Sequence, residues 1–247
     1  MAVLALMLFP PVELCAQAQS LRWPVSESIT RINSGMDNNK SADIVSDYKC
    51  GNNSYDGHRG TDIGTPRNSA VYAAATGSVQ ARVDGFGDGY VGSQDGLGFG
   101  NHVVLFHGTN YTTIYAHFTS GTGIPAKGDT IECGAKIGAS GNSGSSSGPH
   151  MHFEIRINAS RTSSYSGTAV DPFSGACSTP VSYWTGLNTA EVPTTQCGTP
   201  VVAIRGGDPF PVRSGKSDAE TFYDALGRNP CPNVLPGTVP GLIRKGN

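Results

Sequence analysis

Short runs of β-forming residues, separated by glycine-rich loops, fill the middle of the chain and limit the folds that are open to it. These runs cover residues 69–83, 101–108, 111–118, 129–141 and 150–158. The second and third are separated only by Thr109 and Asn110, which predicts a β-hairpin. The last run, HMHFEIRIN, alternates apolar and polar residues, as a half-buried strand does. The pattern predicts an all-β fold, a small antiparallel β structure that is rich in loops.

The composition disfavours two other classes of protein. Charged residues make up 15% of the chain, below the roughly 25% of a typical soluble domain. A bundle of amphipathic helices needs more charged residues on its solvent face than this chain has. The 17 basic and 19 acidic residues give a net charge of −2, whereas a surface that binds nucleic acid normally shows a basic excess. We therefore expect no nucleic acid among the partners.

The amino terminus indicates export from the cytoplasm. An uninterrupted apolar run comes first, and Ala16-Gln17-Ala18 follows as a small-x-small cleavage signal. This predicts a signal peptide over residues 1–18, cut after Ala18, and a secreted or periplasmic mature chain. The apolar run is too short for a retained transmembrane helix, so we expect no stable membrane insertion. Cys15 leaves a lipoprotein open as an alternative, although Leu14 before it is larger than expected at a lipidation site.

Five cysteines remain after the signal peptide, and an oxidising compartment favours disulfides among them. They are Cys50, Cys133, Cys177, Cys197 and Cys231, with no Cys-x-x-Cys pair of the kind that indicates a structural zinc site. We predict that Cys177 pairs with Cys197 across one apparent loop and that Cys50 pairs with Cys133. Cys231 is then left over, as a free thiol or as the partner of a cysteine in another chain.

Composition divides the mature chain into three parts. Residues 19–54 are polar and irregular around one apolar cluster, LRWPV. Residues 55–175 hold the β-forming runs and form the predicted functional domain. Residues 176–247 are rich in Pro and Gly and form a C-terminal extension of unassigned fold. Within this extension, Ser217 and Glu220 form a capping box that predicts one short helix.

The first candidate metal-binding pattern joins a histidine to an aspartate. His58 and Asp62 are four residues apart, in a stretch whose glycines disfavour a helix. On a straight strand the two residues would be about 13 Å apart, whereas zinc ligands lie about 2 Å from the ion. We therefore expect the chain to bend or bulge near Gly60, so that both side chains share one metal ion.

Two further patterns place histidines on strands. His150 and His152 are two residues apart and point to the same face of a strand, so both imidazoles can reach one site. His117 ends the predicted hairpin, and the same alternation puts Tyr115 on its face and Ala116 on the opposite one. The three patterns therefore offer several imidazoles and one carboxylate to a common site.

A zinc site follows from the donor types. His58, Asp62 and one of the pair His150 and His152 make a set of three nitrogen and oxygen donors. Three protein ligands plus water are typical of a catalytic zinc site, whereas structural sites are closed by four ligands. Two further histidines would then carry out acid–base and charge-stabilising work.

Other polar residues near these patterns have simpler interpretations. We expect His102 and His107 to be strand or turn residues with satisfied hydrogen bonds. Asp56 and Glu154 are near enough in sequence to orient an imidazole, but solvated or capping roles are the simpler expectation for both. Residues 140–148 hold no Gly-x-Ser-x-Gly elbow next to a strand–helix turn, which argues against a serine hydrolase.

The motifs occur together in one order. His58-x-x-x-Asp62 is followed by Tyr115-Ala116-His117, and then by SGNSG running into GPHMHFE, which contains His150 and His152. Over about residues 55–157 this combination resembles the lysostaphin/LytM-type zinc metallopeptidases, peptidase family M23. The resemblance implies a narrow groove with one zinc ion at its floor. It also implies that His58, Asp62 and His152 bind the zinc and that His117 and His150 are the catalytic pair.

The resemblance further implies a secreted endopeptidase that hydrolyses peptide bonds in peptidoglycan stem or cross-bridge peptides by attack of metal-bound water. His150 would help to activate the water and His117 would stabilise the charged intermediate, or the two roles would be exchanged. Loops 84–100 and 140–148 would line the groove, and the protein would act as a monomer. Two alternatives stay open: a catalytically silent LytM-like regulator of a cell-wall amidase, and a secreted peptidase acting on Gly-rich protein.

Overall fold

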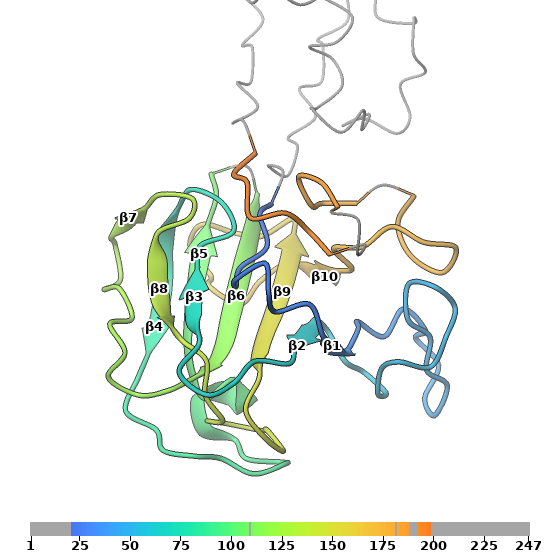
Figure 1. Cartoon of the computed structure of the whole chain (residues 1–247), viewed down its shortest axis with the longest axis horizontal. Helices are drawn as coiled ribbons and strands as arrows, with labels where there is room; N and C mark the ends of the chain where they lie inside the picture. Colours follow the sequence, from blue (N-terminus) through green and yellow to red (C-terminus); the bar gives the residue numbers. More distant parts are fainter. Residues whose placement is uncertain (1–20, 109, 181, 188–191, 199–247) are drawn as a thin grey trace, which may run out of the picture. The chain divides into compact units, whose positions relative to one another are not determined.

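The computed structural model describes residues 21–108, 110–180, 182–187 and 192–198 (Figure 1). The predicted signal peptide, Cys231 and the short helix expected near Ser217 lie outside these described residues. Within them, ten strands and one short 3-10 helix make up the regular structure, and every strand pair is antiparallel. The predicted all-β antiparallel fold is confirmed. No helix in this part of the chain has the length and apolar character that crossing a membrane requires.

An eight-stranded sheet forms most of the fold. Its spatial order is β1 (Ile32–Ser34), β2 (Thr61–Ile63), β9 (Met151–Ile157), β6 (Tyr111–Phe118), β5 (Asn101–Phe106), β4 (Gly77–Val83) and β7 (Thr130–Ile131), and β10 (Thr168–Val170) also pairs with β9. A small second sheet pairs β3 (Ala70–Tyr72) with β8 (Lys136–Ala139). The 3-10 helix η1 (Asp95–Gly98) lies in the long loop between β4 and β5. Strands β5 and β6 form the predicted hairpin.

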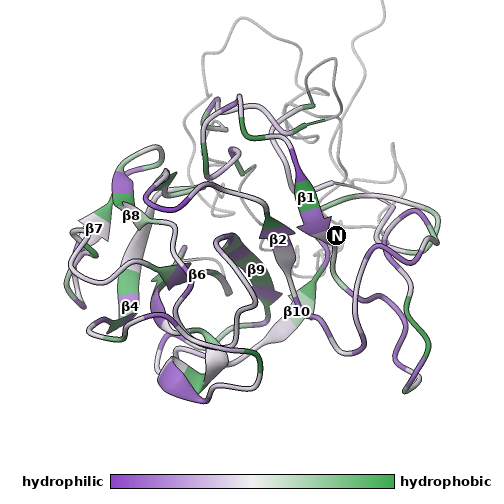
Figure 2. Ribbon diagram, turned by 60° about the horizontal axis from the view of Figure 1, so that its bottom comes forward, coloured by the Kyte–Doolittle hydropathy of each residue, from purple (hydrophilic) through white to green (hydrophobic). Residues whose placement is uncertain are grey.

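Strand β9 separates a core face from a site face. Met151, Phe153 and Ile155 are fully buried in the hydrophobic core. His152 and Glu154 alternate with them, and Figure 2 shows the resulting stripes of hydrophobic and hydrophilic residues along β9. The prediction of a half-buried strand is wrong for the polar face, because His152 and Glu154 are only 5% and 2% exposed. Neighbouring side chains and loops cover that face, and so its polar groups must find partners inside the protein.

The segments on both sides of the predicted domain complete the same core. Trp23 and Trp184 are fully buried and meet edge to face, with ring centroids 5.3 Å apart. The ring of Trp184 also stacks on Phe153 of β9, at 5.3 Å. Upstream, β1 extends the large sheet by pairing with β2. The domain limits at residues 55 and 175 stay a prediction, and the described flanking segments pack on the domain that lies between them.

The disulfide pairing differs from the one that the sequence suggested. Cys50 pairs with Cys177, with Cα atoms 5.1 Å apart, and Cys133 pairs with Cys197, with Cα atoms 6.0 Å apart. Both predicted pairs, Cys177–Cys197 and Cys50–Cys133, are therefore wrong. The carboxy-terminal segment runs past two different parts of the fold, and the backbone N–H of Cys177 donates to the carbonyl of Tyr48. Nearness along the sequence was a poor guide, because each disulfide ties a flanking segment to a distant part of the chain.

Candidate metal centre

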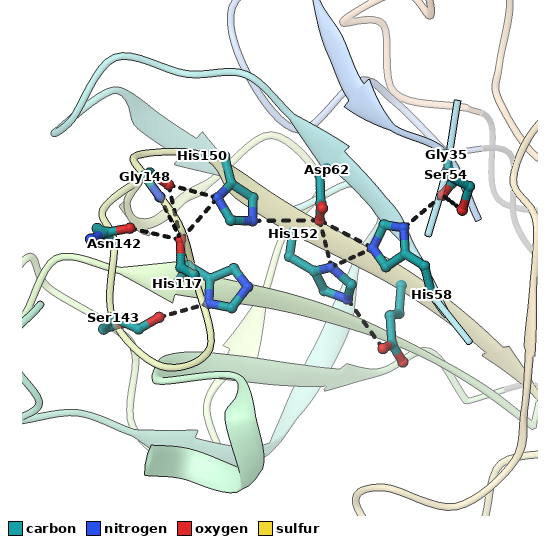
Figure 3. Close-up of polar contacts among 12 residues, drawn as sticks. Gly35, Ser54, His58, Asp62, His117, Asn142, Ser143, Gly148, His150 and His152 are labelled. Carbon is teal, nitrogen blue, oxygen red and sulfur yellow. Dashed lines mark hydrogen bonds and ion pairs between the residues drawn. The ribbon is translucent and has the colours of Figure 1, made fainter. Parts of the chain in front are cut away.

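The three predicted ligands converge where β2 and β9 lie side by side (Figure 3). Asp62 and His152 are directly opposite each other in the β2–β9 ladder. The Nδ1 atom of His152 lies 2.8 Å from Oδ1 of Asp62. The Nε2 atom of His58 lies 3.2 Å from both of these atoms. One nitrogen or oxygen atom from each residue can therefore reach a single ion between them.

Glycines allow this convergence. Strand β2 begins only at Thr61, and His58 lies in the preceding turn, so the chain departs from a straight strand as expected. A Cβ atom at Gly60 would lie 2.4 Å from the carbonyl oxygen of Phe153 and 2.8 Å from the ring of His152. Gly60 is therefore needed for close approach of the two chain segments. Gly57 is needed for a different reason, since its φ of 72° is in the left-handed region.

Hydrogen bonds determine which ring nitrogen of each ligand faces the site. A carbonyl or carboxylate oxygen only accepts, so the ring nitrogen that contacts it must carry the proton. The Nδ1 atom of His58 donates to the carbonyl of Gly35 over 2.6 Å, which leaves Nε2 as the nitrogen that faces the other two ligands. Both ring nitrogens of His152 contact carboxylates, Nε2 that of Glu154 over 3.1 Å and Nδ1 that of Asp62 over 2.8 Å, so the ring holds a proton on each while no metal is bound. A metal ion would take the place of the Nδ1 proton, while Glu154 keeps the proton on Nε2.

The electrostatics of the site favour negative charge at the centre. Burial opposes ionisation of Asp62, but hydrogen bonds with His150, His152 and His58 hold its pKa far below the ordinary value. Burial alone would lower the pKa of His152, but hydrogen bonds to Asp62 and Glu154 raise it to about 9. Burial also disfavours the charged form of Glu154, yet contact with His152 lowers its pKa. Two buried carboxylates are therefore held ionised within reach of one imidazole.

The donor set fits one zinc ion. His58, Asp62 and His152 are only 3%, 7% and 5% exposed, so the ligand atoms are shielded from bulk water. Two imidazole nitrogens and one carboxylate oxygen are ordinary zinc ligands, and three protein ligands leave a position for water or substrate. The chemistry and the geometry of these residues therefore agree with the zinc site that the sequence predicts.

His150 lies immediately beside the three ligands. Its Nδ1 atom donates to the carbonyl of Gly148 over 2.8 Å. Its Nε2 atom is 3.5 Å from Oδ1 of Asp62. The rings of His150 and His117 have centroids 4.6 Å apart. The structure thus brings all five sequence-predicted site residues together.

His117 reaches the site through a β-bulge at the end of β6. The last two β5–β6 pairs are Val103 with Tyr115 and Asn101 with Phe118, so β6 carries one residue more than β5 between them. The φ of His117 is 62°, a conformation that is uncommon for residues other than glycine. The expectation that Tyr115 and His117 share a face is therefore wrong. Tyr115 packs in the hydrophobic core, whereas the bulge turns His117 into the site.

The bulge is held in place by the neighbouring loops. The backbone N–H of His117 donates to the carbonyl of Phe99 over 2.9 Å. Its ring Nδ1 donates to the carbonyl of Ser143 over 2.7 Å. Burial, followed by the nearby charges of His150 and His152, lowers the pKa of His117 to about 3. The ring is therefore kept neutral, with Nδ1 protonated and a lone pair on Nε2.

The two glycine-rich loops have different positions relative to the site. A pocket of about 310 Å³ opens at Asp62 and His150, and Gly148 of the second loop contributes to its lining. The loop between β4 and β5 packs against residues 140–148, where the backbone N–H of Gly89 donates to the carbonyl of Asn142. The described lining of this pocket includes no residue of the 84–100 loop. The loop nevertheless reaches the site, because the ring centroids of Phe99 and His152 are 5.8 Å apart.

Two residues beside the ligands were assigned wrongly or missed. Glu154 was expected to be a solvated or capping residue, but it is buried and accepts a hydrogen bond from His152. The two-residue alternation that joins His150 to His152 also places Glu154 on the same face, so the signal was present. Tyr55 stacks on the ring of His58 with centroids 4.2 Å apart, and no motif indicated it. Asp56 is exposed, in line with the simpler expectation for it.

Fold and site together define an all-β domain with a candidate zinc centre. Similarity to known proteins adds a family to this description. Residues 56–172 match the model of peptidase family M23.

Several known proteins are similar to part of the chain. The chain is 36% identical over 115 residues to a protein of Haemophilus influenzae named as an uncharacterized metalloprotease, covering 47% of this chain and 20% of the relative. It is 34% identical over 100 residues to the peptidoglycan DD-endopeptidase ShyA of Vibrio cholerae, covering 40% of this chain and 20% of the relative. A solved zinc-containing peptidase from Vibrio cholerae has a TM-score of 0.44 and 26% identity, over 63% of this chain and 39% of that one. The matched part of the chain thus spans about a fifth of the length of these two curated relatives.

Proposed function

We propose that this protein is a zinc-dependent endopeptidase that acts outside the cytoplasm and hydrolyses peptide bonds in peptidoglycan stem or cross-bridge peptides. One observation carries the proposal. One nitrogen or oxygen atom from each of His58, Asp62 and His152 lies within 4.8 Å of the other two, and two more histidines lie beside them. The peptidoglycan substrate is supported by the match of residues 56–172 to peptidase family M23 and by the similarity to the peptidoglycan DD-endopeptidase ShyA of Vibrio cholerae.

In this proposal His58, Asp62 and His152 hold the ion. When bound, zinc supplies a Lewis acid that lowers the pKa of water and polarises a peptide carbonyl. Glu154 keeps the proton on Nε2 of His152 and so directs Nδ1 toward the ion. Gly35 does the same for His58 by accepting from its Nδ1 atom. The residues around the ligands therefore set the geometry of the centre before a substrate arrives.

His117 and His150 form the proposed acid–base pair. Each is held by a backbone carbonyl at Nδ1, from Ser143 and Gly148 respectively, so each presents Nε2 as a proton acceptor. One ring takes up the proton of the attacking water, and the protonated ring then returns it to the leaving amine nitrogen. A protonated ring beside the scissile carbonyl also stabilises the negative charge that develops on its oxygen.

The proposed location rests on separate observations. The two disulfides, Cys50–Cys177 and Cys133–Cys197, suit an oxidising compartment. The substrate class of the Vibrio cholerae relative, peptidoglycan, is also found outside the cytoplasm. Cleavage of a signal peptide near Ala18 belongs to the same proposal, and sequencing the amino terminus of the exported protein tests it.

Digestion of isolated peptidoglycan tests the function. The full chain is incubated with peptidoglycan, with and without a chelator, and released fragments are identified by mass spectrometry. We expect new amino termini in the presence of zinc and none with the chelator. Zinc-loaded protein that creates no new amino termini contradicts the proposal. Fragments that appear only when a cell-wall amidase is added would point to the regulatory alternative.

A further inference from the structure

A second pocket opens beside the candidate metal centre and has no part in the mechanism proposed above. Its volume is about 410 Å³. It lies between the segment that carries Lys40, the turn that carries His58 and Arg59, and the neighbouring strands β9 and β10, with Arg156 and Thr168 in its lining. His58 is shared between this pocket and the proposed zinc site. The pocket is therefore directly adjacent to the point where a peptide would be cut.

The pocket continues along the site face of β9. Arg156 and His152 lie on the same face of this strand, because they are an even number of residues apart. Four residues of strand correspond to about 13 Å, and an extended peptide advances about 3.3 Å per residue. An extended substrate that passes His58 on its way from the centre would span this distance with about four residues.

Some of the charged side chains that line the pocket already have partners within the protein. Arg156 is buried and forms an ion pair with Glu154, Nε to Oε2, over 2.7 Å. Asp37 accepts backbone N–H groups at both oxygens, from Asn39 at Oδ1 and from Gly57 at Oδ2. The charge of Arg156 is therefore neutralised by Glu154, and both carboxylate oxygens of Asp37 already accept hydrogen bonds. They form a fixed polar frame around the pocket.

Two cations remain to face a ligand. Lys40 and Arg59 are exposed, line the pocket, and form no ion pair with another described residue. Asp56 is also exposed in this lining and is the one opposing acid there without a hydrogen bond to a described residue. The charges of Lys40, Arg59 and Asp56 therefore sum to +1 at the pocket.

We propose that this pocket is a subsite for a free carboxylate of the substrate, recognised by Arg59 and Lys40. An ammonium and a guanidinium group bind a carboxylate through charge-assisted hydrogen bonds. The subsite favours stem peptides that carry free carboxylates over uncharged bridges such as oligoglycine. This inference rests on the proposed peptidase function and names the class of peptide that the enzyme selects.

Binding measurements test the subsite without relying on turnover. The probes are a peptidoglycan stem peptide with free carboxylates and the same peptide with its carboxylates converted to amides. Each is titrated calorimetrically into the zinc-loaded full chain carrying His117→Ala, which should slow cleavage by at least about a hundredfold. We expect the acid to bind about fivefold to tenfold more tightly than the amide, as charge-assisted contacts at a partly exposed site allow. Equal affinities, or no measurable binding of either peptide, overturn the proposal.

Variants of the lining identify the groups responsible. Arg59→Gln and Lys40→Gln should each weaken binding of the acid by about threefold to fivefold and leave the amide unchanged. Asp56→Asn should have the opposite effect and tighten binding of the acid, because it removes the opposing charge. Lys127→Gln is the matched control, since Lys127 is an exposed lysine outside the pocket lining. An acid-to-amide ratio that is unchanged in both Arg59→Gln and Lys40→Gln also overturns the subsite.

Hydrolysis by the unaltered chain separates the two proposals. If both peptides are cut with the same kcat/KM, the peptidase function stands and the carboxylate subsite fails. If neither peptide is cut although the acid binds preferentially, the subsite stands and the proposed catalytic function fails. Cleavage of the acid with a lower KM than the amide supports both.

Discussion

Two groups of histidines lie in or beside the strands of the large sheet, and all of them are buried. His102 and His107 belong to the β5 region, and each has both ring nitrogens engaged. The Nδ1 atom of each contacts a backbone carbonyl, and Nε2 of each contacts a hydroxyl group, that of Tyr165 for His102 and that of Thr113 for His107. The expectation that these two histidines have satisfied hydrogen bonds is confirmed.

The histidines of the candidate site have a different pattern of contacts. Each has one ring nitrogen held by a carbonyl or by Glu154, while the other faces Asp62 or a second site histidine. The Nε2 atom of His117 makes no hydrogen bond with a described residue. Burial therefore does not distinguish structural from functional histidines in this fold. The partner of the second ring nitrogen does, because no site histidine has a hydroxyl group there, whereas His102 and His107 both do. The following predictions test that distinction.

The largest effect is expected when a ligand is removed. His152→Ala should lose bound zinc and peptidase activity together, because Nδ1 of His152 is one of only three protein donors. Zinc content is measured by elemental analysis of the purified full chain, and activity by release of new amino termini from peptidoglycan. A His152→Ala variant that keeps a full zinc equivalent shows that the ligand set is wrong.

Replacement of the strained histidine should separate activity from metal binding. His117→Ala should lower kcat by about a hundredfold to ten-thousandfold, the range expected for a general acid or base, and should retain zinc. The reason is that His117 stands beside the three donors and is held by Ser143. Elemental analysis and kinetics on the same preparation check both parts. Loss of zinc in this variant would contradict the assignment of His117 to the catalytic pair and not to the zinc ligands.

Replacement of the structural histidine His107 should change the free energy of unfolding and not the peptidase activity. Burial lowers the pKa of His107 from 6.5 to about 4. Between these values the unfolded chain binds a proton that the folded chain does not, so the free energy of unfolding should fall as the pH is lowered from 6.5 to 4. The expected loss is about 3 kcal/mol. Denaturant unfolding across this range should show a clearly shallower pH dependence in His107→Gln, and equal slopes would contradict the account.

The smallest effect is expected for the carboxylate that positions a ligand. Glu154→Gln should weaken zinc affinity by about tenfold to a hundredfold, as is typical when a partner of a metal-bound imidazole is changed. The loss of charge weakens the hold on the Nε2 proton of His152. Competition with a chromophoric chelator measures the affinity, and the exposed Glu132→Gln serves as the control. Unchanged affinity in Glu154→Gln would show that Glu154 acts only as the partner of Arg156.

Local patterns predicted much of this protein. Alternation along 150–158 and the short turn at Asn110 gave the strands that carry the site, since both signals act within a few residues. The choice of His152 over His150 as a ligand came from family resemblance, because two residues on one face are equivalent in sequence. The same alternation places Glu154 on the face of His152, although the expected role of Glu154 was that of a solvated or capping residue.

What the sequence did not reveal depends on contacts between distant residues. The carbonyls of Gly35 and Ser143, which fix two tautomers, are backbone groups that any residue type supplies. The bulge at His117 depends on how β5 and β6 are paired, and no residue marks it. The disulfide partners are set by the paths of the flanking segments around the core.

Anomalous diffraction at the zinc edge, from crystals of the full chain, tests the central claim most directly. The account predicts one zinc peak, bounded by Nε2 of His58, Oδ1 of Asp62 and Nδ1 of His152, with His117 and the two β5-region histidines uncoordinated. A peak ligated by His102 or His107, or by the Nε2 atom of His152, would contradict the claim that the imidazole nitrogens facing Asp62 form the metal site.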